Sequence, residues 1–168
     1  MVKPLIALAI VIIFISIGVI HSSRYRKRCS ELMLIREALE EISVMIRFRA
    51  VPVGELLSSL LSKDRYEKSM FLHKLKEGFE GENIQIKNIW GKALEETVYL
   101  NTDDKEIILS VGNNLGDTDT EGQLSMLTMA SELIGKNLDT AVSEKLKSEK
   151  LVLSMWMFTG IGIGIMII

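Results

Sequence analysis

Hydrophobic residues along the chain form two uncharged runs at the ends, with a helical repeat between them. The first run, PLIALAIVIIFISIGVI, covers residues 4–20, and the second covers residues 151–168. At about 1.5 Å per residue each run makes a helix of about 26 Å, close to the ~30 Å hydrocarbon layer of a bilayer. The pattern therefore predicts one transmembrane helix at each end of the chain.

Between these runs, apolar residues recur at spacings of three and four, the period of a helix with one buried face. Over residues 30–50 we expect a packed seam, widened by four further apolar side chains. The seam is Leu32, Ile35, Leu39, Ile42 and Ile46, and the widening residues are Met33, Val44, Met45 and Phe48. Pro52 ends this helix, because a residue that precedes proline disfavours the α-helical region.

Five more helices follow from the same period and from cap residues. They are expected over residues 53–61, 65–79 (capped by Asp64), 86–99, 105–113 (after a cap at Thr102) and 121–150. The sequence thus predicts an all-α protein, in which a cytosolic six-helix bundle over residues 22–150 is flanked by two single transmembrane helices.

The stretch LSVGNNLGDTDTEGQ, residues 109–123, separates the last two patterns of the bundle. Gly116 can adopt the left-handed conformation that closes a helix, and residues 117–120 are good N-caps. We therefore predict a sharp helical corner over residues 115–120. The same residues match the opening of a calcium loop, but its twelfth position is Thr128 rather than a bidentate glutamate. Helix capping explains them with fewer assumptions.

Basic residues next to both hydrophobic runs predict the membrane topology. Cytoplasmic flanks of membrane spans are rich in lysine and arginine, so both flanks indicate a cytoplasmic bundle and a two-pass protein. A cleavable signal peptide is the alternative for residues 4–20, but no A-x-A-like site follows them. The basic residues are Arg24, Arg26, Lys27 and Arg28 after the first run, and Lys145, Lys147 and Lys150 before the second.

Charge and composition supply little chemistry. The net charge of -2 gives no basic field for nucleic acid, and the single cysteine, Cys29, allows no intramolecular disulfide and no cysteine-rich zinc site. His21 and His73 have no ligand partners at metal-binding spacing, and no P-loop pattern is present. We therefore predict no catalytic residues, cofactor, metal or nucleic-acid partner.

A placement argument predicts a partner-binding surface. A first helix of about 30 Å carries the junction near Pro52 away from the membrane, and the antiparallel last helix brings residues 113–120 to the same pole. The candidate partner-binding residues are Arg47, Arg49, Glu55, Asn113, Asn114, Asp117 and Asp119. The alternative is that these residues only cap helices and close turns.

Several segments together resemble the stage III sporulation protein AB family. They are EALEEISVMIRFRAVPVGELL (residues 37–57), the helix with Trp90, LGDTDTEGQ (residues 115–123) and the glycine-containing terminal run. The resemblance covers essentially the whole chain. It implies a likeness to the cytoplasmic domain of type II secretion F proteins, and a place on the mother-cell side of the outer forespore membrane.

The resemblance also implies partners: a cytosolic secretion-like ATPase, stage III sporulation protein AA, and other members of the same complex between mother cell and forespore. A platform that docks this ATPase is the favoured function, and it is compatible with a homo-oligomer. A membrane-bound helical sensor or signalling adaptor is the alternative, but it needs a ligand-receiving domain outside the membrane. An enzyme would need an acid/base or nucleophile set that we do not find.

Overall fold

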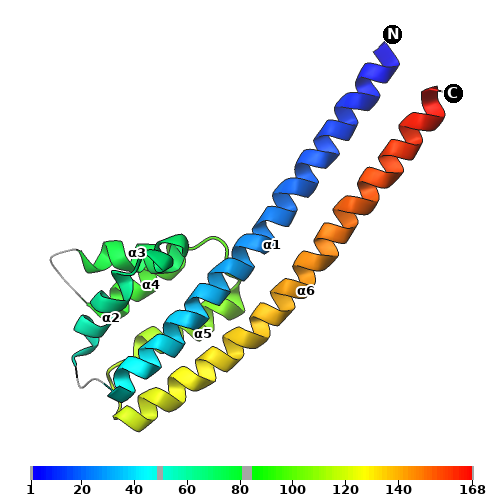
Figure 1. Ribbon diagram of the computed structural model, residues 1–168. Helices are drawn as coiled ribbons and strands as arrows, with labels where there is room; N and C mark the ends of the chain where they lie inside the picture. The colour runs from blue at the N-terminus through cyan, green and yellow to red at the C-terminus, as the bar shows by residue number, and fades with distance from the viewer. Residues whose placement is uncertain (1, 49–50, 81–84, 168) are drawn as a thin grey trace. The chain divides into compact units, whose positions relative to one another are not determined.

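The computed structural model describes the backbone of residues 2–48, 51–80 and 85–167. Side chains are described for residues 23–48, 51–80, 85–152 and 154–155. Within these residues every element is helical, which confirms the predicted all-α class (Figure 1). The elements are α1 (Val2–Phe48), α2 (Val53–Leu61), the 3-10 helix η1 (Asp64–Lys68), α3 (Met70–Phe79), α4 (Ile86–Glu96), α5 (Thr102–Asn114) and α6 (Thr120–Ile167).

The chain divides into two compact units. A central unit comprises Arg28–Asp139, and a terminal unit combines Met1–Lys27 with Thr140–Ile168. The central unit therefore holds all of α2 to α5, together with the last part of α1 and the first part of α6.

The predicted membrane spans fall largely outside the described side chains. Residues 4–20 belong to α1 and residues 151–167 belong to α6, but the side chains of residues 4–20, 153 and 156–168 are not described. Among the residues that are described, no helix combines the length and the apolar character needed to cross a bilayer.

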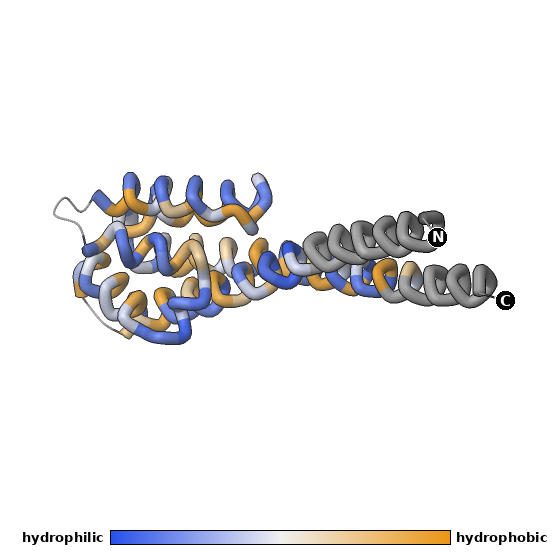
Figure 2. The backbone as a smooth tube through the Cα atoms, turned by 90° about the horizontal axis from the view of Figure 1, so that it is seen from above, coloured by the Kyte–Doolittle hydropathy of each residue, from blue (hydrophilic) through white to orange (hydrophobic). Residues whose placement is uncertain are grey.

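The core of the central unit is built around the predicted seam of α1. Leu32, Ile35, Leu39 and Ile42 are each at most 2% exposed. Hydrophobic and hydrophilic residues alternate along the helices of this unit, as the period of a one-sided buried helix requires (Figure 2). Large buried side chains from the other helices complete the core: Leu57, Leu60, Tyr66, Phe71, Leu75, Trp90, Ile108 and Leu127.

Trp90 holds α3, α4 and α5 together. Its ring meets Phe71 of α3 edge to face at a centroid distance of 5.4 Å, and its indole Nε1–H donates to the carbonyl of Ile108 at 2.8 Å. On α5, a Cβ placed on Gly112 would lie 2.3 Å from the Trp90 ring. Glycine at position 112 is therefore required for the close approach of α4 and α5.

The predicted widening of the α1 seam is wrong at three of its four positions. Met45 is buried, whereas Met33, Val44 and Phe48 are 48%, 56% and 77% exposed. The helix turns about 100° per residue, so a residue two positions from Ile42 points to the opposite side. These side chains form an exposed apolar face rather than a second seam.

The predicted start of the third helix is also wrong. Residues 64–68 form η1, and α3 begins only at Met70. Ser69 is the N-cap of α3, and its hydroxyl accepts from the Leu72 N–H at 3.2 Å. Glu31 of α1, a buried carboxylate, in turn accepts hydrogen bonds from Ser69 Oγ at 2.6 Å and from the backbone N–H groups of Met70 and Phe71 at 2.9 and 2.8 Å. An acidic group from another helix thus satisfies the free N–H groups at the N-terminus of α3.

Two smaller boundaries differ from the prediction. The N-cap of α5 is Asn101 rather than Thr102, because Asn101 and Asp104 form a reciprocal capping box. α4 ends at Glu96 rather than at residue 99, and Val98, within the predicted helix, is 60% exposed.

Asp104 connects three helices through a buried ionic network. Its carboxylate is fully buried and accepts from Arg28 Nε at 2.9 Å and Arg28 Nη2 at 3.2 Å. Asn137 Nδ2 donates to the same carboxylate at 2.8 Å, and the Asn101 backbone N–H donates at 3.1 Å. The network therefore joins α1, α5 and α6.

Glu41 organises a second charged cluster, at the periphery of α1. Its carboxylate accepts from Lys63, from Arg65 and from the Tyr66 hydroxyl, the last at 2.7 Å. Burial acts to raise the pKa of Glu41, but hydrogen bonds from Lys63 and Tyr66 and the charges of Lys63 and Arg65 outweigh it and lower the pKa. Burial and the bond to Glu41 raise the pKa of Tyr66 well above its usual range.

Replacing Leu39 by alanine tests the seam. Leu39 is 2% exposed, so Leu39→Ala should lower the free energy of unfolding by about 2–5 kcal/mol. Val44→Ala, on the exposed side of the same helix, should change it by less than about 0.5 kcal/mol. Urea unfolding of the full chain in detergent, followed by circular dichroism, measures both. Equal losses at the two positions would contradict the assigned orientation of α1.

The Glu41 cluster predicts an acid-sensitive contribution to stability. Because the folded pKa of Glu41 lies below its ordinary value of 4.5, this contribution is present above pH 4.5 and is lost as the pH falls through the folded pKa. The difference in urea midpoint between the native chain and Glu41→Gln should therefore shrink below pH 4.5. The exposed Glu95→Gln serves as control. If the difference in urea midpoint stays unchanged below pH 4.5, the ionised form of Glu41 does not stabilise the fold.

Candidate partner-binding surface

The corner between α5 and α6 has the predicted geometry. Gly116 adopts a φ of +90°, in the left-handed region, and Asp119 Oδ1 accepts from the Gly122 N–H at 3.0 Å, which caps the start of α6. A Cβ on Gly116 would lie 3.2 Å from Val53 Cγ2. The first turn of α2 therefore lies against the corner.

The end of α1 lies beside the start of α6. The two helices run antiparallel within the central unit (Figure 1). Ser131 Oγ donates to Glu40 Oε1 at 3.2 Å, and a Cβ on Gly135 would lie 3.5 Å from Arg36 Nη1. In this register each step forward on α1 matches one step back on α6, so Phe48 comes opposite Gln123.

These contacts bring most of the candidate residues to one end of the central unit, hereafter the tip. The tip consists of the end of α1, the first turn of α2 and the α5–α6 corner. All the described candidate residues there are exposed: Arg47, Glu55, Asn113, Asn114, Asp117 and Asp119. Arg49 lies outside the described residues.

Hydrogen bonds and ion pairs between described residues involve the side chains of only three of these six residues. Asn114 Nδ2 donates to the Ser110 carbonyl at 2.7 Å, Asp117 pairs with Lys87 at 2.6 Å, and Asp119 is the cap described above. In contrast, no hydrogen bond or ion pair within the described part of the chain involves the side chains of Arg47, Glu55 or Asn113. Capping and turn closure therefore leave these three side chains available.

The acidic residues of the corner are engaged with the protein rather than arranged around a cation. Asp117 pairs with the Lys87 ammonium and Asp119 with a backbone N–H. Across the described residues, no group of three or more His, Cys, Asp or Glu side chains could hold a metal ion. The arrangement agrees with helix capping.

Sequence reasoning missed one residue at the tip, Phe48. It is 77% exposed and directly follows Arg47. Large aromatic and arginine side chains are the residue types that most often anchor protein–protein contacts. The signal was present in the pattern, because Phe48 lies six residues after Ile42 and is therefore rotated by about 120° from the seam.

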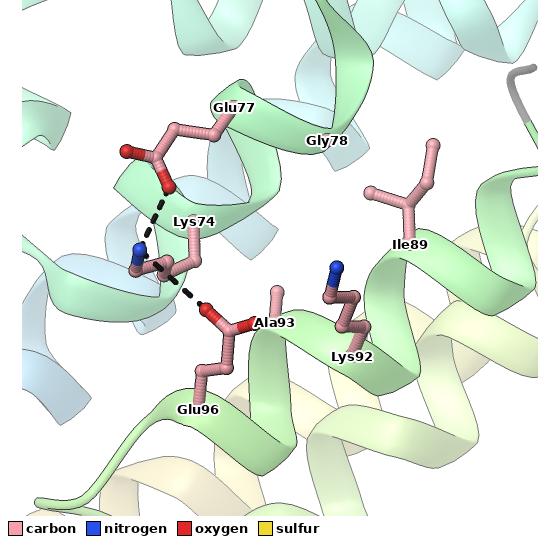
Figure 3. Close-up of a pocket in the computed structure, with 7 residues that line it drawn as sticks. All are labelled: Lys74, Glu77, Gly78, Ile89, Lys92, Ala93 and Glu96. Carbon is pink, nitrogen blue, oxygen red and sulfur yellow. Dashed lines mark hydrogen bonds and ion pairs between the residues drawn. The ribbon is translucent and has the colours of Figure 1, made fainter. Parts of the chain in front are cut away.

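A pocket lies between α3 and α4, apart from the candidate residues (Figure 3). It has a volume of about 270 Å³, and Lys74 lies there between Glu77 at 2.8 Å and Glu96 at 3.5 Å. The two helices approach closely because Gly78 faces Ile89. The remaining lining residues are Lys92 and Ala93. The hydrogen bond and the charge of Glu77 raise the pKa of Lys74, so that its ammonium stays protonated and is not a nucleophile.

Comparisons with known proteins identify the family. The family model described as stage III sporulation protein AB matches residues 3–168. No curated protein sequence matches the chain. A solved structure titled "Stage III sporulation protein AB (SpoIIIAB)" is similar, with a TM-score of 0.60 and 16% identity over 72% of this chain and 98% of that chain, and it supports the fold. The resemblance recognised in residues 37–57 and 115–123 is thus confirmed, and the chain belongs to the stage III sporulation protein AB family of sporulation-complex components.

Proposed function

We propose that this chain is a membrane-anchored platform that holds a cytosolic secretion-like ATPase of the sporulation complex. The observation that carries the proposal is the tip, where Phe48 is 77% exposed beside Arg47 at the end of α1. An exposed aromatic side chain beside an arginine combines two of the residue types that most often anchor protein interfaces.

The membrane anchoring in this proposal rests on the sequence. Residues 4–20 and 151–168 carry no charge, and each run adjoins a basic cluster. Under the positive-inside rule the bundle, residues 22–150, faces the cytoplasm between two spans. Family membership supports a location on the mother-cell side of the outer forespore membrane.

The proposed partner is the ATPase of the same complex, stage III sporulation protein AA. Family membership supports a sporulation partner, and the polar rim around Phe48 suits a soluble protein that binds and releases. A sensor or signalling adaptor is the other class, and it would need a ligand-receiving domain outside the membrane. The raised pKa of Lys74 in the α3–α4 pocket also favours a role without catalysis.

Cysteine labelling tests the topology. In a Cys29→Ser background, Ser58→Cys on the exposed side of α2 should react with a membrane-impermeant maleimide only after permeabilisation. When the chain is produced in non-sporulating cells and inserted in their plasma membrane, Val2→Cys, before the first span, should react without permeabilisation. Labelling of Ser58→Cys in intact cells would refute the two-pass orientation.

Charge reversal at the tip tests the docking surface. Arg47→Glu should weaken ATPase binding by the full chain at least tenfold, about 1.4 kcal/mol. Because Arg47 is exposed and has no partner in the described residues, the melting temperature should stay nearly unchanged. Arg49→Glu should act in the same way. Biolayer interferometry on nanodisc-embedded chain measures the binding.

A matched control is Lys68→Glu, another reversal of an exposed cation. Lys68 lies next to Ser69, whose hydroxyl bonds Glu31, and Glu31 is 17 residues or about 26 Å along α1 from Phe48. Lys68→Glu should bind like the native chain. If Arg47→Glu also binds like the native chain, the tip is not the docking surface.

A further inference from the structure

A second apolar surface lies in the central unit, in a groove between α5 and α6. It encloses about 280 Å³, and apolar side chains form most of its lining. Met129 at its edge is 64% exposed. The lining residues are Ile107, Val111, Met126, Met129, Ala130 and Leu133, with Glu106 and Ser110.

The groove arises because α6 carries two apolar stripes. Leu127, Ala130 and Ile134 are buried in the core. Met126, Met129 and Leu133 form the second stripe, spaced by three and four residues, and it borders the groove instead. On α5, Ile107 and Val111 face it with the same helical spacing. Val111 and Ala130 belong to the core, and the less buried Ile107, Met126, Met129 and Leu133 leave an apolar furrow beside them.

Carboxylates border this furrow. Glu106 belongs to its lining, Asp103 lies one turn before Ile107 on α5, and Glu132 lies three residues after Met129 on α6. All three are exposed, and the ion pairs of the described residues include none of them. Lys136 is the neighbouring cation on α6, so the rim remains net acidic.

We propose that the α5–α6 groove binds one amphipathic helix of a partner protein, with apolar residues on one face and lysine or arginine beside them. An apolar furrow between two helices matches the side-chain stripe of a third helix, and flexible methionines adapt to its shape. The acidic rim selects cationic flanks by charge complementarity. Helix α5 has 13 residues, about 20 Å, and so accommodates about three to four turns of the partner helix.

A second copy of this chain fits the groove less well. The exposed apolar face of α1 holds Met33 and Val44, but Glu37 lies between them in the sequence, whereas Glu40 is paired with Arg36. Docking this face would place the Glu37 carboxylate against the acidic rim, where like charges repel. The groove shares no lining residue with the candidate residues of the tip, and Val111 in its lining lies two residues before Asn113.

Methyl NMR tests the proposal on the full chain in neutral phosphatidylcholine nanodiscs. The probe is a designed 15-residue helix with leucines on one face and lysines beside them, and a matched peptide carries glutamates in place of the lysines. With ¹³C-methyl methionine labelling, the lysine peptide should shift the Met126 and Met129 signals saturably. Met33, which is 48% exposed, reports on non-specific apolar contact and should not shift.

Charge-reversal variants complete the test. Glu106→Lys combined with Glu132→Lys should weaken binding of the lysine peptide at least tenfold, whereas the exposed Glu95→Lys on α4 should leave it unchanged. Equal shifts at Met33, or equal binding of both peptides, would overturn the proposal in favour of non-specific association. Shifts of Met126 and Met129 on concentrating the chain without peptide would overturn it in favour of a second copy.

Discussion

The arrangement of the long helices depends on the compensation of one buried charge. Asp104 has no exposed side-chain surface, and an isolated carboxylate in that position would cost several kcal/mol. Arg28 supplies two hydrogen bonds in the fork geometry that guanidinium groups favour, and Asn137 and the Asn101 N–H supply the others. Because these donors come from α1, from α6 and from the cap of α5, the charge is satisfied in only one relative placement of the three helices.

Glu31 is a second buried carboxylate that needs hydrogen-bond donors, and its donors position the smaller helices. A carboxylate on α1 receives Ser69 and two backbone N–H groups, and so determines where α3 begins. Trp90 then joins α3 to α4 and α5 through Phe71 and the Ile108 carbonyl. The tip and the α5–α6 groove are thus surfaces of a scaffold whose helices are positioned from within by polar contacts as well as by apolar packing.

The sequence predicted the features that depend on interactions between residues a few positions apart. The seam of α1, the left-handed Gly116 and the caps of the α5–α6 corner follow from residues within a few positions of each other. The start of α3 combines both kinds of interaction: its N-cap, Ser69, is local, whereas Glu31, which accepts from the Ser69 hydroxyl, lies 38 positions away and could not be found from local spacing. Sequence spacing also could not show that the Met126–Met129–Leu133 stripe lies outside the core, since an apolar stripe looks the same in either place. The exposure of Phe48, in contrast, could have been predicted from its angle to the seam.

The antiparallel register of α1 and α6 couples the lengths of the two helices. Glu40 meets Ser131 and Arg36 meets Gly135, while Arg28 and Asn137 both reach Asp104. A single inserted residue between Arg28 and Phe48 would rotate the end of α1 by about 100° and move it by about 1.5 Å. Seven residues keep a helix nearly in phase, with a drift of about 20°. Relatives that lengthen this unit should therefore carry paired insertions of about seven residues, one in each helix.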